Sequence, residues 1–373
     1  MYFRKTILFM LFFIYAVVIQ AQQRKNIYIP DIPGYHTLKC DFHTHTVFSD
    51  GTVWPTVRVD EAWREGLDAL AISDHIEYRP HSGDIIADHN RSFDVAKPLA
   101  DRQGIILVRA AEITRNMPPG HLNVLFITNA NLLERENVYD ALKEAGDQGA
   151  FIFWNHPGWK VQQPDTTRWW DEHTRLLNEG LLQGIEVCNA NEYYPEALTW
   201  SVQKGLAVLC NSDAHDPIGL SFDLVNSHRP MTLVFAKEKT EQSIKEALFA
   251  KRSVAYFGDT LMGPQELLQP LFFASLKFDR IPVALSNNKL AYVKVKNISD
   301  IDYILELAQP TVGFKSPENF IIQAHHTVNL ELAGTSDEVE TMKSLRIYYQ
   351  VKNMLIAPDS NLIVAFDIPN VNQ

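Results

Sequence analysis

The fold can be inferred from one stretch, Lys39-Cys40-Asp41-Phe42-His43-Thr44-His45-Thr46-Val47-Phe48-Ser49-Asp50-Gly51. It starts apolar and extended, carries two histidines and ends in a Ser-Asp-Gly turn. Because residues i and i+2 of a strand point to the same face, His43 and His45 can converge on one point. Asp50 follows in the turn, and histidine and carboxylate are the usual ligands of catalytic first-row metals. Two surface histidines on an edge strand would show the same spacing, so the rest of the chain has to decide.

Short apolar runs alternate with amphipathic segments from Pro55 to Lys251, a pattern typical of a parallel α/β architecture. Pro55–Gly66, for example, has a proline near its start and a glycine at its end, as helices do. Four later apolar runs end in polar side chains, at Asp74-His75, Glu112, Asn155-His156 and Asp213-Ala214-His215. In α/β barrels the carboxyl ends of the strands form the rim on which active sites are built. We therefore expect these residues to meet His43 and His45 on one rim.

Nine residues at or near these strand ends have side chains that bind metals: His43, His45, Asp50, His75, Glu112, His121, His156, Asp213 and His215. One divalent ion takes about four to six ligands, so the set predicts two or three ions. Glu112 is the natural bridge, because its two carboxylate oxygens can bind separate metals. A core histidine with a hydrogen-bond partner is a real alternative for a single residue such as His121, and a much weaker one for the whole set.

The order of these motifs, from His43-x-His45 to Asp213-Ala214-His215, resembles that of the PHP (polymerase and histidinol phosphatase) superfamily over roughly Leu38 to Gly263. The resemblance implies a distorted (β/α)7 barrel that holds two or three metal ions. Asp50 stands where some members have histidine. Carried over by position, the resemblance implies three ligand sets: His43, His45, Glu112 and Asp213; Glu112, His121 and His156; and Asp50, His75 and His215.

A narrower resemblance, to the exported phosphodiesterases of the Sb-PDE family, lies in Val53-Trp54-Pro55, Arg64-Glu65-Gly66-Leu67-Asp68 and the segment from His75 to His81. It implies hydrolysis of phosphate diesters by a hydroxide that bridges two divalent ions (Mn, Zn or Fe), with Glu112 and Asp213 in catalytic positions. In the loop after His75, we expect Arg79 to clamp a phosphate oxygen and His81 to protonate the leaving alkoxide. Packing within the loop accounts for Arg79 equally well.

Three alternatives stay open. A phosphomonoesterase could use the same metal site, but a monoester brings an extra negative charge and needs more Arg or Lys near phosphorus, whereas the tryptophans near the motifs favour a diester. An amidohydrolase barrel also begins with His-x-His, but it normally uses a bridging carbamylated lysine where this chain has Glu112. The third alternative is a non-enzymatic binding protein, in which the β-rich C-terminal part recognises a glycan or a protein.

The chain divides into three predicted parts. Residues 1–21 are expected to be a signal peptide, because Arg4 and Lys5 precede the apolar run Ile7–Ile19 and small Ala21 precedes a polar segment. Residues 22–268 form the expected metal-dependent phosphoesterase barrel. From Leu271 onward there is no clear helix pattern, and alternating segments such as Val293-Lys294-Val295-Lys296 predict a small all-β, sandwich-like domain over 269–373.

Composition restricts the partners. The formal net charge of −11 argues against a nucleic-acid-binding surface. The apolar run near the N-terminus is too short for a comfortable membrane span, so we expect an exported protein, periplasmic or secreted, with no stable span after signal removal. The expected partner is a small-molecule phosphate ester. The three cysteines lie in apolar segments and are expected to be buried thiols.

Overall fold

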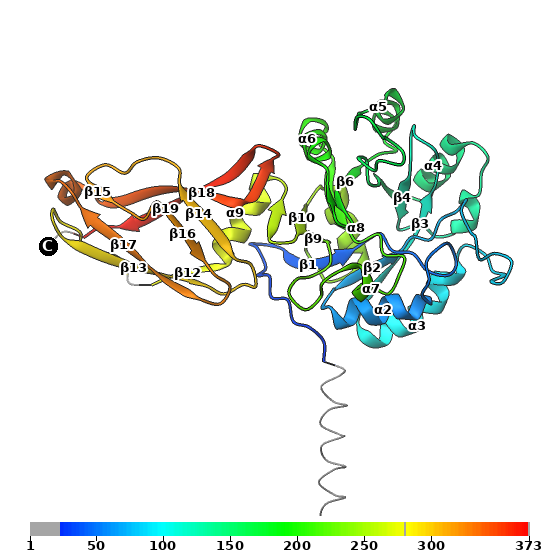
Figure 1. The fold of residues 1–373 in the computed structure, drawn as a ribbon, viewed down its shortest axis with the longest axis horizontal. Coiled ribbons are helices and arrows are strands. Elements are labelled where there is room, and N and C mark those ends of the chain that lie inside the picture. Colours follow the sequence, from blue (N-terminus) through cyan, green and yellow to red (C-terminus); the bar gives the residue numbers. More distant parts are fainter. Residues whose placement is uncertain (1–22, 280, 372–373) are drawn as a thin grey trace, which may run out of the picture.

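The computed structural model describes residues 23–279 and 281–371, so the predicted signal peptide lies outside the described residues (Figure 1). The helices gather in the N-terminal part, and an all-β part follows it at the opposite end of the molecule. Within the described ranges the strands form one fifteen-stranded and one four-stranded sheet. No helix in these ranges has the length and apolar character needed to cross a membrane.

The helices of the N-terminal part alternate with strands, as the sequence pattern predicts. The helical segments of this part are α2 (Pro55–Arg64), α3 (Arg91–Gln103), η1 (Ala130–Leu133), α4 (Val138–Asp147), α5 (Asp171–Asn178), α6 (Pro195–Lys204), α7 (Ile218–Ser221), α8 (Glu241–Phe249) and α9 (Gln265–Ala274), and one short 3₁₀ turn, η2 (Asp337–Thr341), lies among the strands of the C-terminal part. The strands of this part are β1 (His36–Asp41), β2 (Ala69–Ile72), β3 (Ile106–Ile113), β4 (Leu122–Leu125), β5 (Phe151–Trp154), β6 (Gly184–Asn189), β7 (Glu192–Tyr193), β8 (Ala207–Asn211), β9 (Met231–Ala236), β10 (Ser253–Phe257) and β11 (Thr260–Met262).

The sheet of the N-terminal part is mixed, which corrects the expectation of a parallel one. β1 pairs in parallel with β2, and β2 with β3, but β1 pairs antiparallel with β9, and β4 is antiparallel to both β3 and β5. At the other end of this row, β8 pairs in parallel with β6. The carboxyl ends of β1, β2, β3, β5 and β8 therefore supply the polar residues that the sequence places there.

The row of strands curves back on itself. Thr232 of β9 accepts a hydrogen bond from the Cys210 amide of β8 and donates one to the Cys210 carbonyl, each at 2.9 Å. An isolated parallel bridge also joins Thr44, just beyond β1, to Ala214, just beyond β8. The end of β8 therefore lies beside the end of β1, although about 170 residues separate them in the chain. The cysteines Cys40, Cys188 and Cys210 are buried free thiols, as expected.

Helix α9 contradicts one expectation from the sequence. No helix was expected from Leu271 onward, but α9 runs through Pro270 and Leu271 to Ala274. Proline in a helix interior removes one backbone hydrogen bond. Burial of Leu267, Leu268, Leu271 and Phe272 on one face of α9 outweighs that loss, since each buried large apolar side chain contributes about 1.5–3 kcal/mol.

The C-terminal part consists of two sheets packed face to face. Its strands are β12 (Leu276–Asp279), β13 (Leu290–Asn297), β14 (Tyr303–Leu307), β15 (Phe314–Lys315), β16 (Asn319–Ile322), β17 (Thr327–Gly334), β18 (Ser344–Ala357) and β19 (Ser360–Pro369). The rings of Phe278 in β12 and Phe366 in β19 meet across the two sheets with centroids 5.1 Å apart.

One strand pair joins the two parts. β18 extends out of the C-terminal part and pairs in parallel with β11, with Leu261 opposite Met354 and Met262 opposite Leu355. Leu355 also packs against the core cluster that contains Tyr194 and Leu198 of the N-terminal part. Main-chain hydrogen bonds thus cross the boundary predicted between residues 268 and 269, and the position of that boundary stays a prediction.

Candidate metal centre

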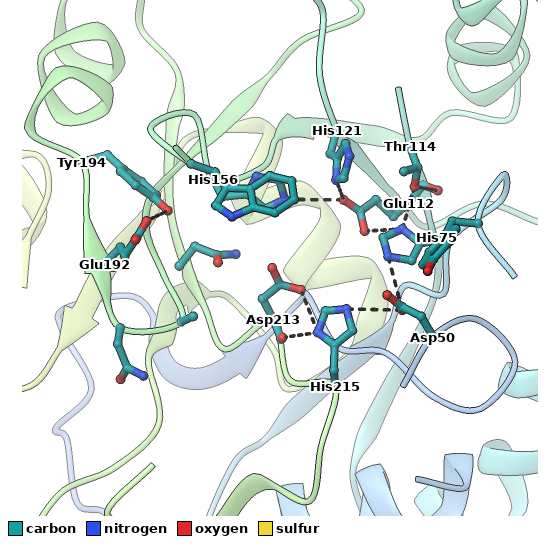
Figure 2. Close-up of a pocket in the computed structure, with 15 residues that line it drawn as sticks. Asp50, His75, Glu112, Thr114, His121, His156, Glu192, Tyr194, Asp213 and His215 are labelled. Carbon is teal, nitrogen blue, oxygen red and sulfur yellow. Dashed lines mark hydrogen bonds and ion pairs between the residues drawn. The ribbon is translucent and has the colours of Figure 1, made fainter. Parts of the chain in front are cut away.

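The structure brings all nine predicted ligands together at the ends of the strands, and Figure 2 shows seven of them, all except His43 and His45. His43 and His45 follow β1, His75 follows β2, and Glu112 lies in β3. His121 precedes β4, His156 follows β5, and Asp213 and His215 follow β8. An isolated parallel bridge between His75 and Glu112 fixes two of these strand ends side by side.

The potential ligand atoms fall into three groups, within each of which the atoms lie no more than 4.8 Å apart. The groups are His45, Asp50, His75 and His215; His43, His45 and Glu112; and Glu112, His121 and His156. Asp213 adjoins the second group, because its Oδ1 lies 3.1 Å from His43 Nε2 and 3.0 Å from His45 Nε2. Compared with the ligand sets that the resemblance implies, His45 additionally approaches the Asp50 group.

Glu112 stands between two of the groups. Its Oε1 lies 2.8 Å from His121 Nδ1 and 3.7 Å from His156 Nε2. Its Oε2 lies 3.4 Å from His43 Nε2 and 3.3 Å from His45 Nε2. Oε2 also lies 2.9 Å from His75 Nδ1. The two oxygens thus face different sets of histidines, which is the geometry that a carboxylate bridging two ions requires.

The Ser-Asp-Gly turn carries Asp50 to the opposite edge of the site. Asp50 Oδ1 lies 3.4 Å from His75 Nε2 and 3.3 Å from His215 Nε2. The turn presses against the end of the preceding strand, where a Cβ at Gly51 would lie 2.7 Å from the backbone of His45. Glycine is needed at this position because any side chain would push the turn, and Asp50 with it, away from the site.

The buried polar atoms of the site fit metal ions. Although several of these atoms lie close to one another, seven of them form no contact with hydrogen-bond geometry among the described residues: His43 Nε2, His45 Nε2, Asp50 Oδ1, Glu112 Oε2, His121 Nδ1, His156 Nδ1 and Asp213 Oδ1. Leaving a buried polar group unpaired costs about 1–3 kcal/mol, and more if the group is charged. Such a concentration of unpaired nitrogen and oxygen atoms in one place is what coordination by divalent cations would resolve.

The electrostatics of the site keep its carboxylates ionised. Burial favours the neutral form of Glu112, but the surrounding histidines hold the pKa of Glu112 well below its usual value. Burial would lower the pKa of His43, but Asp213 and Glu186 raise that pKa well above its usual value. Burial and two neighbouring histidines lower the pKa of His45 to about 3. The carboxylates are therefore ionised and His45 is neutral, the forms in which these groups bind metals, whereas His43 keeps a proton that a bound ion would displace.

Glu186 is the important residue that the sequence analysis missed. It is fully buried in β6, and its Oε1 lies 2.9 Å from His43 Nδ1. Its Oε2 accepts hydrogen bonds from the His156 amide and from Asn189 Nδ2, each at 2.8 Å. A single carboxylate inside an otherwise apolar strand was the signal that could have revealed it, because a buried charge needs partners.

Two of the predicted ligands have unusual backbone conformations. The φ angles of His156 and Asp213 are 29° and 51°, in the left-handed region that residues other than glycine seldom occupy. Such a conformation costs on the order of 1 kcal/mol and persists where surrounding contacts hold it. The His156 amide is held by Glu186, and the Asp213 amide donates to the His43 carbonyl at 2.9 Å.

A cavity of about 540 Å³ opens onto the ligand groups. Besides seven of the predicted ligands, the residues that line it are Tyr78, Thr114, Trp159, Asn189, Ala190, Asn191, Glu192 and Tyr194. Arg79 and His81 do not line it. The Arg79 guanidinium donates hydrogen bonds to the carbonyls of Phe48 and Ala87 at 3.2 and 2.7 Å. The side chain that was expected to clamp phosphate is therefore bound to the protein backbone instead.

Comparison with known proteins identifies the family. A two-domain protein from Bacteroides vulgatus that contains a predicted PHP-like metal-dependent phosphoesterase is 43% identical to this chain, with a TM-score of 0.88. The match covers 93% of this chain and 99% of that one. The chain belongs to the PHP-like metal-dependent phosphoesterase family. This match confirms the resemblance to the PHP superfamily that the sequence motifs indicated.

Other matches to this PHP-like phosphoesterase are more distant. An amidohydrolase from Chromobacterium violaceum is 18% identical over 49% of this chain and 89% of that one, with a TM-score of 0.38. A protein from Bifidobacterium adolescentis assigned as a metal-dependent phosphoesterase is 18% identical over 56% of this chain and 95% of that one, with a TM-score of 0.40. Because both TM-scores are below 0.5, we infer neither fold nor function from these two matches. Residues 276–367 match a family model described as an Ig-like domain. No curated protein matches significantly.

Proposed function

We propose that this PHP-like phosphoesterase hydrolyses phosphate diesters at a centre of two or three divalent ions. The observation that carries the proposal is the composition of the cavity. It opens directly onto three adjoining ligand groups, yet no lysine or arginine is among the described residues that line it. Three aromatic side chains, Tyr78, Trp159 and Tyr194, form part of its wall.

The charge of the substrate separates the two candidate reactions. A phosphate monoester carries close to two negative charges at neutral pH, whereas a diester carries one. A site for monoesters gains from Arg or Lys beside the phosphorus, since charge-assisted hydrogen bonds from these groups to phosphate are strong. The lining offers none, and its aromatic rings instead offer apolar contact to an ester substituent.

Each group of residues has a task in the proposed reaction. Bound divalent ions would activate water and neutralise charge on the phosphate oxygens. Glu112, with its two oxygens facing different sets of histidines, would hold two ions near each other. Asp213 and His45 would fix the position of the ion nearest Glu112 Oε2. Trp159, whose ring centroid lies 5.2 Å from that of His156 and 5.7 Å from that of His121, would exclude bulk water on that side.

Two further expectations belong to the proposal. The curved row of strands from β1 to β8 supports assignment as the distorted (β/α)7 barrel of the PHP superfamily. The sequence of residues 1–21 supports export to the periplasm or the medium, where metal availability would decide among Mn, Zn and Fe.

The test compares bis(4-nitrophenyl) phosphate with 4-nitrophenyl phosphate, using protein loaded in turn with Mn, Zn or Fe. We expect a higher kcat/KM on the diester with at least one metal. A consistent preference for the monoester would overturn the proposal in favour of a phosphomonoesterase. Asp213→Asn and His45→Ala should each abolish hydrolysis, with circular dichroism showing that the fold remains. Activity that survived both substitutions would remove this centre from the reaction.

A further inference from the structure

One lobe of the cavity is not explained by the metal ligands. It lies beyond Asp213 and is formed by the β6–β7 hairpin and the residue after it, with Asn189, Asn191, Glu192 and Tyr194 along its wall (Figure 2). In Figure 2, Glu192 and Tyr194 lie on the side of the cavity opposite Asp50 and His75. A phosphate held at the ligand groups would therefore extend one of its two ester substituents into this lobe.

Glu192 carries the one formal charge among the lining residues that are not predicted metal ligands. Its Oε2 accepts a hydrogen bond of 2.7 Å from the hydroxyl of Tyr194. Among the described residues it forms no ion pair with a lysine or an arginine, although many exposed carboxylates of this chain do. Glu192 is exposed to solvent at the mouth of the cavity, and the Tyr194 hydroxyl holds its carboxylate in place without neutralising its negative charge.

The Tyr194 ring that holds Glu192 is itself fixed. A Cβ at Gly158, two residues after His156, would lie 2.4 Å from Tyr194 Cδ1, so the ring rests directly on the Gly158 backbone. Tyr194 is 6% exposed and its amide donates to the Val187 carbonyl at 2.8 Å. The lobe therefore combines an ordered carboxylate and a fixed aromatic ring, with a second ring, Trp159, among the residues of the same cavity.

We propose that this lobe binds an ammonium group on one substituent of the diester, so that the substrate is a phosphodiester of an amino alcohol, with Glu192 as the specificity-determining residue. The inference rests on the proposed diesterase function. Aromatic rings together with a carboxylate favour a quaternary or primary ammonium over neutral or anionic groups, through the ring quadrupole and through Coulomb attraction. Because no Lys or Arg is among the described residues that line the cavity, an anionic substituent would find no cationic partner in that lining and would be repelled by Glu192.

The test uses three 4-nitrophenyl phosphodiesters that differ only in the second substituent: choline, its uncharged isostere 3,3-dimethylbutyl, and glyceryl. The choline and dimethylbutyl groups have nearly the same shape, so their ratio of kcat/KM isolates the charge. We expect the choline ester to be preferred about tenfold over the isostere, and the preference to weaken at high salt. In Glu192→Gln the ratio should fall to about one. The matched control Glu238→Gln, an exposed glutamate outside the cavity, should leave the ratio unchanged.

The outcomes are distinguishable. Hydrolysis of all three diesters without a preference for choline would overturn the ammonium site and leave the diesterase proposal standing. A preference for the glyceryl ester would mean that the lobe recognises hydroxyl groups, which also overturns it. A choline preference retained in Glu192→Gln would show that Glu192 is not its source. Failure to cleave any of the diesters while cleaving 4-nitrophenyl phosphate would refute the proposed function itself.

Discussion

His43 Nδ1 lies 2.9 Å from Glu186 Oε1, and both side chains are completely buried. A carboxylate can only accept in this pair, so Nδ1 carries the hydrogen and Nε2 is left to face Glu112 and Asp213. A histidine that binds a metal through one nitrogen commonly has its other nitrogen held in this way, which fixes both the tautomer and the ring orientation. Glu186 is therefore a positioning residue for the centre.

Replacing Glu186 with glutamine should weaken the centre. The amide can present a donor to His43 Nδ1 and favours the wrong tautomer, so we expect metal affinity to fall by roughly 10–100-fold. Isothermal titration of the metal-free protein with Zn or Mn measures this directly. The Glu238→Gln variant serves as the control for loss of one surface charge. Unchanged affinity in Glu186→Gln would show that the His43 contact only packs the strands.

The number of ions can be counted. Purified active protein should contain at least two equivalents of divalent metal by elemental analysis, because three ligand groups adjoin one another. The double substitution His121→Ala and His156→Ala should lower the count by about one, since both residues ligate only through the group that Glu112 Oε1 faces. Fewer than two equivalents in active wild-type protein would refute the multinuclear centre.

Arg79→Ala should leave the rate of hydrolysis largely unchanged. The guanidinium donates to the carbonyls of Phe48 and Ala87 and does not reach the cavity lining. We expect kcat/KM to fall by less than tenfold, together with faster proteolysis of the loop at residues 79–90. A phosphate clamp would instead lose about a hundredfold or more in kcat/KM when removed, and a loss of that size would restore the role that the sequence suggested.

The buried ion pairs of Arg229 should contribute strongly to the free energy of unfolding. Arg229 donates to Asp41 Oδ2 at 2.9 Å and to both oxygens of Glu65 at 2.7 and 2.8 Å, with its side chain fully buried. Arg229→Met leaves two carboxylates without their partner, so the free energy of unfolding should fall by about 3–5 kcal/mol. Arg346→Met, which removes an exposed pair with Asp367, should cost about 1 kcal/mol or less. Denaturant unfolding of the two variants compares them, and equal losses would contradict this assignment.

Acid should destabilise the protein through His173. This ring stacks on Trp154 with centroids 3.7 Å apart, its Nε2 lies 2.7 Å from the Pro119 carbonyl, and burial lowers its pKa to about 4. The unfolded chain, with a histidine pKa near 6.5, binds the proton first as pH falls. Stability from this group is therefore full above about pH 6.5 and declines toward pH 4, by roughly 3 kcal/mol. The pH dependence of the unfolding free energy should be shallower in His173→Phe over this window; identical slopes would rule out His173 as its source.

The sequence by itself determined the metal-binding character of the site. Spacing and order placed His43, His45, Glu112, His156 and Asp213 at strand ends, because strand periodicity and the position of turns are local properties that single segments reveal. Helices with clear start and stop residues were equally accessible. α2 begins at Pro55 as predicted and ends at Arg64, two residues before the expected Gly66.

Only the tertiary structure decided which atoms face one another. Glu186 and Arg229 carry no motif, and their roles arise from partners more than 100 residues away that meet only in the folded chain. The antiparallel neighbours of β1 and β4 and the helix through Pro270 likewise depend on packing that outweighs local preference. The cavity wall, including Glu192 and Tyr194, is assembled from separate loops. Local patterns specify which side chains can bind a metal, whereas long-range burial specifies where they point and what can bind beside them.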